Sequence, residues 1–486
     1  MFSAIDWSVI AVYLVGTTWL GHWLRGPQQS NFDFFLGGRS VPWPAVAASS
    51  IATTISAITF VSVPALVFAS EGNFTYLQLA IAGILSRVIV AYFLVPHYFS
   101  GEFYSPYDFT RSRLGPAAGQ LISVLFLLGG VLGQSVRVYA TALVLELLTG
   151  WALSTSVLMI AVFSILWTWM GGIRTVIWTD VVQFFILIGS AIFVLCFIAL
   201  SLPSLSVETW QTTIESKLTV FNFTSDPRVA FTFWAALIAL PFQNIAVYGG
   251  DQLFVQRLLC CQDQIAARKA VLLSTLGELI PLIMLSVGLG LVLYYQTYPI
   301  PDLYTELVQD KPDRIFPVFI ISVLPEGLRG LILAGLLSAA ISSLDSILAA
   351  LAQVSSRALG DRLQKIEGVT LSRALVLIWG LVLAAMAVTY QTSELNLVDL
   401  AFTMTTYTYG PMFGLILLSI IGLRTSALCF PAVGFSILLV VGLNHPSFIG
   451  LPYGAPLLAW PWLFPIATLC TLGIALGLDH LRARFT

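Results

Sequence analysis

Charge is scarce in this sequence. Only 9% of its 486 residues are Asp, Glu, Lys or Arg, whereas soluble domains carry about 25%. Hydrophobic residues make up 58%, and the mean hydropathy is +0.91. A chain this poor in charge cannot cover itself with a surface that water wets, so we expect a lipid bilayer to surround most of it. The net charge of −2 and the lack of a long basic run give no support to a nucleic-acid partner.

Cysteine and histidine are also few, and their spacing excludes several kinds of site. None of the five cysteines forms a CxxC pair or a His/Cys metal pattern, so we expect free thiols. The four histidines lie far apart near the ends of apolar runs, and neither HExxH nor GxSxG occurs. This pattern argues against a membrane enzyme such as an intramembrane hydrolase, and no organic cofactor is indicated.

Long apolar runs are what the sequence has in abundance. A membrane-spanning helix needs roughly 20 apolar residues. About thirteen runs qualify, and they lie near 5–24, 42–69, 74–99, 118–149, 153–170, 174–202, 229–248, 270–296, 327–356, 370–391, 395–423, 426–444 and 456–479. The longest polar stretches, 202–228 and 297–326, are too short for a soluble domain, although the second is long enough for a short gating helix. We therefore predict an all-α polytopic membrane protein with a single transmembrane domain at 1–486, and a sensor with a signalling domain is disfavoured.

The distribution of basic residues predicts the orientation. The first run follows no basic segment, so we expect a retained helix rather than a cleaved signal peptide. With the N-terminus outside, 15 of the 22 Lys and Arg residues fall in inner loops, five fall in outer loops, and Arg87 and Arg137 fall within helices. Inner loops of membrane proteins are enriched in Lys and Arg. We therefore expect an outside N-terminus and a cytoplasmic C-terminus in a plasma membrane, with a bacterial inner membrane favoured.

Two of the apolar runs are interrupted by polar or helix-breaking residues. In the second run, Thr53, Thr54, Ser56 and Thr59 weaken the hydrophobicity at mid-membrane. In the seventh, Pro241 opens the sequence Pro-Phe-Gln-Asn, and a proline removes one helical hydrogen bond and clashes with the preceding turn. Many transporters bind their ligand where such helices break in corresponding positions of two halves. Close helix packing is the alternative explanation for each hydroxyl taken singly.

The ninth run carries small and hydroxyl residues on one helical face. Positions i, i+3, i+4 and i+7 share a face, and here they are Ala339, Ser342, Ser343 and Ser346. Sodium is a hard cation that prefers anionic or uncharged oxygen ligands. Two serine hydroxyls and one carbonyl supply three oxygens, and carbonyls freed by unwinding near Ala52 and Ile55 add two more. The carbonyls near Ala52 and Ile55, the Ala339 carbonyl and the hydroxyls of Ser342 and Ser343 thus offer about five oxygens, a plausible shell for a dehydrated sodium ion.

Several charged residues lie within predicted spans. An ionised Asp at a helix centre costs about 2.5–3.5 kcal/mol on insertion scales, so Asp180 and Asp345 are expected to face a cavity or a partner. A purely structural explanation is also open for each acid. Asp180 would then lie at the membrane interface or pair with Arg174, and Asp345 would pair with a polar neighbour. Arg137 is a candidate for binding a solute carboxylate, with an ion pair to Glu146 as the alternative. Arg87 and Glu278 are expected to be structural partners.

Three stretches of the sequence resemble the sodium/solute symporter family. They are Phe-Leu-Gly-Gly-Arg-Ser at 35–40, Gly-Gly-Ile-Arg-Thr-Val-Ile-Trp-Thr-Asp at 171–180, and the serine pair at 342–343. The resemblance covers most of the chain. It implies a LeuT-like fold in which a five-plus-five inverted repeat, at 42–202 and 229–423, follows one extra helix at 5–24 and precedes two extra helices at 426–479.

The resemblance also implies roles for individual residues. Its main sodium site maps onto the five residues named above. The tryptophan–threonine–aspartate motif maps onto Asp180, which lies in relatives on the inward sodium path or at a second sodium site, and the remainder of that second site corresponds to Asp345 and Ser346. An acid at 345 departs from the hydroxyl usual in the family, and it leaves open a stronger second sodium site or coupling to a proton.

The resemblance says less about the identity of the solute. Sialic-acid carriers of the family resemble this chain at Thr54, Ser56, Thr59, Phe74 and Gln78 and use an arginine about one turn from Arg137. The seventh run adds Gln243 and Asn244 to the predicted solute residues. Resemblance to the monocarboxylate, vitamin and iodide branch also favours an organic anion.

The sequence therefore predicts a sodium:solute symporter that imports a small polar solute by alternating access and works as a monomer. The alternatives are a proton-coupled symporter and a sodium symporter for a sugar or an amino acid.

Overall fold

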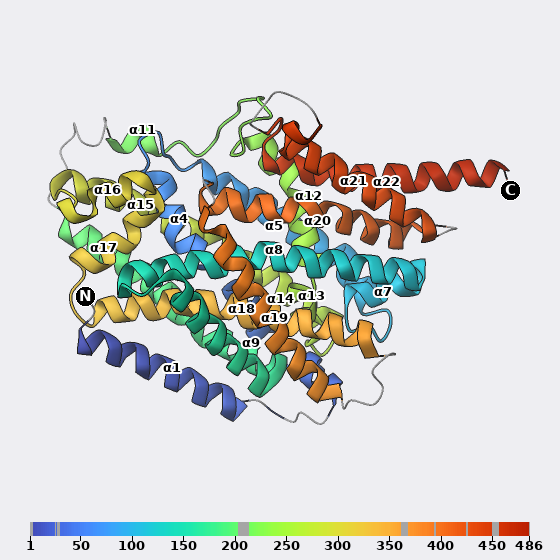
Figure 1. Ribbon diagram of the computed structural model, residues 1–486, viewed down its shortest axis with the longest axis horizontal. Helices are drawn as coiled ribbons and strands as arrows, with labels where there is room; N and C mark the ends of the chain where they lie inside the picture. Colours follow the sequence, from blue (N-terminus) through green and yellow to red (C-terminus); the bar gives the residue numbers. More distant parts are fainter. Residues whose placement is uncertain are drawn as a thin grey trace.

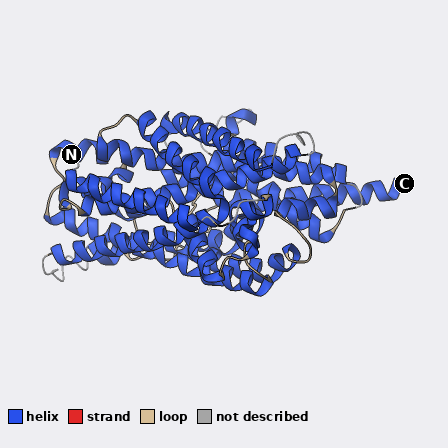
Figure 2. Cartoon of the chain, turned by 90° about the horizontal axis from the view of Figure 1, so that it is seen from below, coloured by secondary structure: helices blue, strands red, loops and turns tan. Residues whose placement is uncertain are grey.

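The computed structural model describes residues 3–24, 26, 30–202, 213–360, 368–392, 395–423, 426–449 and 456–485. Every regular element within these ranges is helical (Figure 2). The longer helices are α1 (Ala4–Leu24), α3 (Trp43–Thr54), α4 (Ala57–Phe68), α5 (Leu79–Ile89), α8 (Pro116–Thr149), α9 (Leu153–Ser201), α14 (Gln264–Leu273), α15 (Leu279–Thr297), α18 (Leu328–Gly360), α19 (Gly368–Thr389), α20 (Leu397–Ile421), α21 (Cys429–Asn444) and α22 (Trp460–Phe485). Shorter helices are α2 (Asn31–Leu36), α6 (Val95–Tyr98), α7 (Pro106–Leu114), α11 (Glu215–Lys217), α12 (Leu240–Ile245), α13 (Gln252–Leu259), α16 (Asp302–Asp310) and α17 (Ile315–Val323).

The apolar helices account for the predicted spans. Ten helices of the described residues are long and apolar enough to cross a membrane, and the bent pair α3–α4 makes an eleventh span. Two shorter apolar helices, Leu153–Trp169 and Ala235–Gly250, lie where the fifth and seventh runs were predicted. The chain is a multi-pass membrane protein, while the count of thirteen spans stays a prediction.

Helix α18 lies at the centre of the molecule. It packs against α9, α8, α1 and α19, and it contacts the broken helix through α3 (Figure 1). Of its most apolar stretch, 94% is buried inside the protein. Small residues at the face that carries Ala339 and Ser342 allow this close packing in a bilayer, where apolar side chains gain little from leaving lipid.

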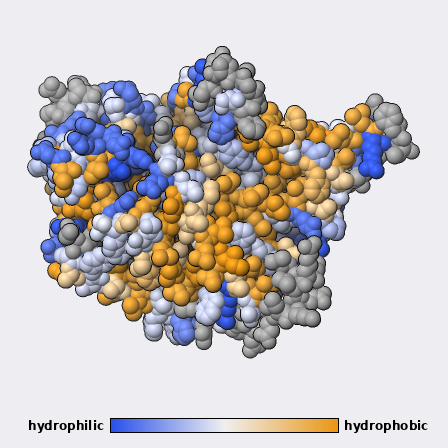
Figure 3. Space-filling model, viewed as in Figure 1, coloured by the Kyte–Doolittle hydropathy of each residue, from blue (hydrophilic) through white to orange (hydrophobic). Residues whose placement is uncertain are grey.

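The outer surface matches a protein surrounded by lipid. Large apolar side chains such as Leu128, Phe185 and Leu200 are exposed, and apolar residues form a broad band across the middle of the face in Figure 3. Polar residues gather at the end of the molecule where α16 and α17 lie (Figures 1 and 3). Helix α16 is the short helix that the sequence placed in the stretch 297–326.

The second span breaks where its hydroxyl residues predict. Helix α3 ends at Thr54, helix α4 begins at Ala57, and the two axes differ by 55°. Ile55 and Ser56 between them are extended, with ψ angles of 130° and 175°. Because the last helical hydrogen bond runs from Ile55 N–H to Ile51 O, the carbonyls of Ala52 and Thr53 are free to face other partners.

The seventh span does not break at Pro241, so that prediction was wrong. The helix runs from Ala235 to Gly250, and a π-helical turn at Ala235–Ala239 directly before α12 absorbs the proline's missing N–H. The chain becomes extended instead at Asp251, whose ψ is 127°. Its carboxylate accepts a hydrogen bond from Leu253 N at 2.7 Å and so caps α13.

Several basic residues bear on the predicted orientation. Arg257 was assigned to an inner loop, but it is completely buried on α13, so that assignment was wrong. Arg25, Arg362, Lys365 and Arg424 lie outside the described residues, as does the segment 203–212 of the polar stretch 202–228. All five cysteines are free, and Cys260 and Cys261 are buried.

Candidate ion and solute sites

The residues predicted to bind sodium come together around the first break. The Ser342 hydroxyl lies 3.3 Å from the Ala52 carbonyl oxygen and 3.2 Å from that of Ala339. The Ser343 hydroxyl lies 3.1 Å from the Ala339 oxygen and 3.4 Å from the Thr53 oxygen. Four of the five predicted residues thus share one hydrogen-bonded group of oxygens, and Ile55 follows directly in the extended segment.

The spacing and burial of these oxygens suit a small hard cation. Oxygen ligands about 2.3–2.6 Å from a cation the size of Ca²⁺ lie roughly 3.3–3.7 Å from their nearest neighbours in an octahedral shell, and sodium has nearly the same radius. The oxygen–oxygen separations in the structure, 3.1–3.4 Å, fall close to this range. Ala52, Ala339 and Ser342 are fully buried, so a dehydrated ion would be held away from water. The residues present therefore fit a sodium ion.

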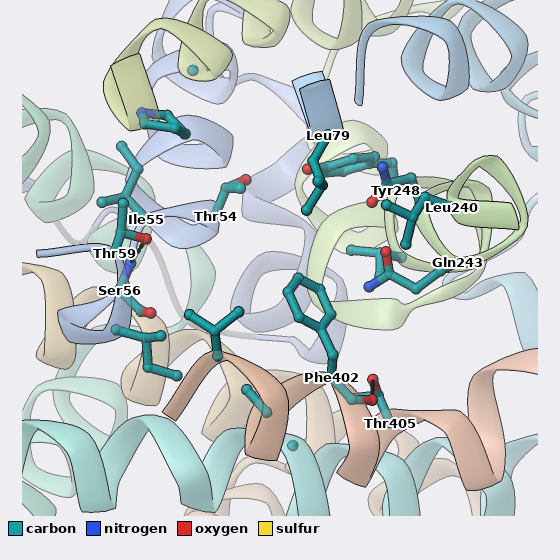
Figure 4. Close-up of a pocket in the computed structure, with 18 of the residues that line it drawn as sticks. Thr54, Ile55, Ser56, Thr59, Leu79, Leu240, Gln243, Tyr248, Phe402 and Thr405 are labelled. Atoms are coloured by element: carbon teal, nitrogen blue, oxygen red, sulfur yellow. Dashed lines mark hydrogen bonds between the residues drawn. The ribbon is translucent and has the colours of Figure 1, made fainter. Parts of the chain in front are cut away.

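A cavity of about 190 Å³ opens beside this group. Its walls come from both sides of the first break, from α8, α12 and α20, and from the segments that carry Tyr248 and Glu278. Figure 4 shows two facing sides, with Thr54, Ile55, Ser56 and Thr59 on one and Leu240, Gln243 and Tyr248 on the other. Phe402 of α20 projects between them. The position agrees with a solute site at interrupted helices.

Most of the predicted solute residues line this cavity. The lining includes Thr54, Ser56, Thr59, Arg137, Gln243 and Asn244. It does not include Phe74 or Gln78, which stay predictions without support from the cavity. The Gln78 amide instead donates to Phe231 O at 2.9 Å and accepts from Asn222 N at 3.3 Å. Gln78 therefore holds the segment after α11 against the start of α5.

Arg137 enters the cavity from α8 and points at the sodium group. Its Nη1 donates to Thr53 O at 2.9 Å and to the Ser343 hydroxyl at 3.3 Å. No carboxylate of the described residues lies within 4.0 Å of its guanidinium, so it does not form the alternative ion pair with Glu146. A guanidinium that lines a cavity without forming a salt bridge favours the binding of an anion, although here the Asp251 carboxylate of the same cavity offsets part of its charge.

A cluster of buried charged groups, made by Asp180, Arg257 and Asp345, lies one turn along α18 from the sodium group. The Asp180 carboxylate accepts from Arg257 Nη2 at 3.0 Å and from the Ser49 hydroxyl at 2.6 Å, so its partner is Arg257 rather than Arg174. Arg257 also donates to the Ser346 hydroxyl. The Asp345 carboxylate accepts from Ser346 at 3.3 Å and is near enough to Asp180 for the two to interact electrostatically.

Oxygens without a partner point to a further role for this cluster. One carboxylate oxygen of Asp180 and one of Asp345 are buried and accept no hydrogen bond from the described residues. Buried polar atoms are nearly always satisfied, by water or an ion where protein groups do not serve. The two acids also outnumber the single arginine. The cluster therefore offers hard anionic oxygen to a cation.

The expected pair of Arg87 and Glu278 is confirmed. The two side chains form a salt bridge, and Arg87 also donates to the Tyr248 hydroxyl at 2.9 Å. Its guanidinium lies 4.0 Å from the centre of the Tyr248 ring. Glu278 and Tyr248 line the cavity, so this structural pair fixes one of its walls.

Asp251 is a cavity residue that the sequence analysis missed. It is buried, lines the cavity, and accepts a hydrogen bond of 2.5 Å from the Tyr409 hydroxyl. The signal was present in Gly249-Gly250-Asp251, a glycine pair followed by a residue that favours helix N-caps. Because Pro241 is the stronger helix-breaking signal, the sequence analysis placed the break there and not at Asp251.

Comparison with known families identifies the class of protein. The family described as the Sodium:solute symporter family matches residues 34–427. The chain belongs to this family. This symporter has sodium as its coupling ion and a small solute as its other transport partner, and it is a transporter rather than an enzyme.

Individual relatives agree with this assignment. The symporter is 29% identical over 439 residues to the sodium/sialic acid symporter SiaT of Proteus mirabilis (strain HI4320), which covers 88% of this chain and 86% of the relative. It is 27% identical over 467 residues to the sodium-coupled monocarboxylate transporter 1 of Homo sapiens, with 93% and 75% covered. A solved structure described as a substrate-bound outward-open state of a Na⁺-coupled sialic acid symporter superposes with a TM-score of 0.86 at 25% identity, covering 99% of this chain and 98% of that one. These likenesses confirm the LeuT-like fold.

Proposed function

We propose that this symporter imports a small organic anion, a monocarboxylate or a sugar acid, by alternating access. Arg137 carries this proposal, because it lines the cavity beside the sodium group and forms no ion pair within 4.0 Å among the described residues, although its charge interacts at longer range with Asp251 in the same cavity. The two relatives named above transport sialic acid and monocarboxylates according to their names. The hydroxyl and amide side chains that line the same cavity suit the polar remainder of a sugar acid.

The sodium ion would bind Ala52, Ile55, Ala339, Ser342 and Ser343. The first two residues belong to the broken helix that also lines the solute cavity, and the last three belong to α18. A cation held between them fixes the extended segment at Ile55 and Ser56. Sodium thereby shapes the wall against which the solute binds, and this supplies the coupling.

Asp180, Asp345 and Ser346 would form a second ion site or the path by which sodium leaves. The unpartnered carboxylate oxygens support this role, because they offer anionic ligands next to the main site. Arg257 contributes one positive charge to the cluster and limits how many cations it accepts.

The chain would consist of two repeats with extra helices at both ends. The first repeat would span 42–202 and the inverted second repeat 229–423, with extra helices at 5–24 and 426–479. The break in each repeat's first helix supports this division, at Ile55–Ser56 in one and Asp251 in the other. We further propose a monomer with its N-terminus outside and its C-terminus cytoplasmic, in a lipid bilayer that is most simply a bacterial inner membrane.

Uptake into proteoliposomes tests the proposed function. Purified protein would be assayed with and without an inward sodium gradient, and with an inward proton gradient alone, against a monocarboxylate, a sialic acid, a neutral sugar and a zwitterionic amino acid. We expect sodium-driven uptake of one of the two carboxylates. Uptake of the sugar or amino acid instead, or uptake driven by protons without sodium, contradicts the proposal.

Two variants locate the ion site in the same assay. Ser343→Ala removes one oxygen ligand, and a hydrogen-bond-strength contact to a charged group is worth about 1.5–3 kcal/mol, so the half-saturating sodium concentration should rise roughly 10- to 150-fold. Ser355→Ala is the matched control, because Ser355 lies about three turns further along α18 and contacts Trp379. Equal sodium dependence in the two variants would remove Ser343 from the site.

A further inference from the structure

Arg137 contacts one of the proposed sodium ligands. Its Nη1 donates to the Ser343 hydroxyl and to the Thr53 carbonyl. Ser343 is one of the proposed sodium ligands, and Thr53 follows another, Ala52, along the chain. The guanidinium therefore contacts one oxygen that sodium would also contact, the Ser343 hydroxyl, and a carbonyl next to another.

The half-buried Arg137 differs in this respect from the two fully buried arginines of the helical core, Arg87 and Arg257. Arg87 is paired with Glu278 and Arg257 with Asp180. Among the described residues Arg137 donates hydrogen bonds only to two neutral oxygens, those of Thr53 and Ser343, and the Asp251 carboxylate interacts with its charge without forming a salt bridge. Neutral oxygens compensate a buried charge less well than a carboxylate does. Arg137 is thus held by weaker contacts than Arg87 and Arg257.

Sodium and the guanidinium cannot both keep their contacts with Ser343 at full strength. Two positive charges on opposite sides of one hydroxyl oxygen repel each other, and the repulsion is large where water is excluded. The contacts to Ser343 and Thr53 join α8 to α18 and to the end of α3. A sodium ion that enters the oxygen group must therefore weaken the attachment of Arg137.

We propose that Arg137 is a tethered competitor of the sodium ion, which sodium displaces into the cavity, where the guanidinium then binds the anionic group of the solute. This inference rests on the proposed function and deepens it. Under this proposal Arg137 keeps its contacts with Ser343 and Thr53 as long as no sodium is bound. After sodium binds, the guanidinium is released toward the solute, so sodium binds first. The solute anion neutralises part of the positive charge next to sodium, so by reciprocity each raises the affinity for the other.

Sodium binding without solute tests this directly. The protein in detergent would be titrated with radioactive sodium, in a scintillation proximity format, for wild type, Arg137→Gln and Arg137→Lys. Arg137→Gln removes the competing charge, so its half-saturating sodium concentration should fall at least threefold below that of wild type. Arg137→Lys keeps the charge but reaches fewer oxygens, so it should fall between the two. A residue that only supported the fold would not make sodium binding tighter when removed.

Arg268→Gln is the matched control. Arg268 also donates to a neutral oxygen, the carbonyl of Ala91 at 3.1 Å, but it lies on α14 and does not line the cavity. Its loss should leave sodium binding unchanged. Addition of the transported carboxylate should tighten sodium binding in wild type and in the control, and it should have no effect in Arg137→Gln.

The outcomes separate this inference from the proposed function. If wild type binds no sodium, the proposed function itself fails. If wild type binds sodium but folded Arg137→Gln, judged by its thermal unfolding, binds it equally or more weakly, only the competition fails. If Arg137→Gln does not fold, Arg137→Lys decides, because unchanged or weaker sodium binding in that variant also overturns the competition.

Discussion

The two breaks in the helical core are built from different chemistry. The first, at Ile55–Ser56, exposes backbone carbonyls that meet serine hydroxyls of α18. The second, at Asp251, places a carboxylate at the start of α13, and two turns later the same helix carries the buried Arg257. The first break thus offers neutral oxygens, which suit a cation. The second offers charged groups, which order the surroundings of the cavity and tie the two breaks together.

Arg257 is the residue that joins the two regions. Its Nε donates to the Ser49 hydroxyl at 2.8 Å, on the helix that leads into the first break. Its Nη2 binds Asp180 of α9 and Ser346 of α18. The buried side chain of Arg257 therefore links the second break to the helix that leads into the first. Substitutions at Arg257, Asp251 and Pro241 test this difference between the two breaks.

Arg257→Met should have the largest effect on stability. It leaves the fully buried Asp180 without its counter-charge, and breaking a buried pair in this way costs about 3–5 kcal/mol. Thermal and denaturant unfolding of the protein in detergent measures the loss. The double variant Arg257→Met with Asp180→Leu should recover much of it, because replacing both partners by apolar residues is often nearly neutral. A double variant no more stable than the single one would show that Arg257 stabilises the fold through Ser49 and Ser346 instead.

Asp251→Ala should have an intermediate effect. It removes the N-cap of α13 and the acceptor of the Tyr409 hydroxyl, and loss of an N-cap costs about 0.5–2 kcal/mol. Asp251→Asn keeps a capping oxygen and serves as the control, with a smaller loss in the same unfolding measurement. If the two variants are equally destabilised, the charge of Asp251 matters more than its cap.

The first region could be predicted from the sequence because its signals are local. Hydroxyl residues spaced on one face of α18, and a cluster of them in the second apolar run, identify both partners without knowledge of the fold. Even so, Ala52 and Ile55 depended on family resemblance for their individual assignment. The contact of Arg137 with Ser343 was beyond prediction, because it depends on how α8 and α18 pack across 206 residues of sequence.

The second region was predicted poorly because its signals compete. Pro241 is a strong local helix breaker, but a wider helical turn accommodates it inside the protein. Arg257 belongs to a segment polar enough to suggest a loop, and only tertiary structure shows that it faces a buried acid. Gln78 illustrates the same limit, since family resemblance placed it in the solute site, whereas in the structure the segment after α11 takes its hydrogen-bonding capacity.

Pro241→Ala should have the smallest effect, and it separates the two explanations of the second break. If proline made the break, its removal would straighten the helix, move Asp251 and abolish uptake. Because the helix already passes through Pro241 and bends at Asp251, we expect a change in unfolding free energy of less than about 1 kcal/mol and sodium-dependent uptake close to that of wild type. Gly249→Ala is the contrasting variant, since an added Cβ there overlaps Leu94 Cδ1 and lies 3.0 Å from Cγ2 of the β-branched Val90, and overpacking costs about 1–3 kcal/mol. Greater loss of uptake in Pro241→Ala than in Gly249→Ala would show that the proline causes the break.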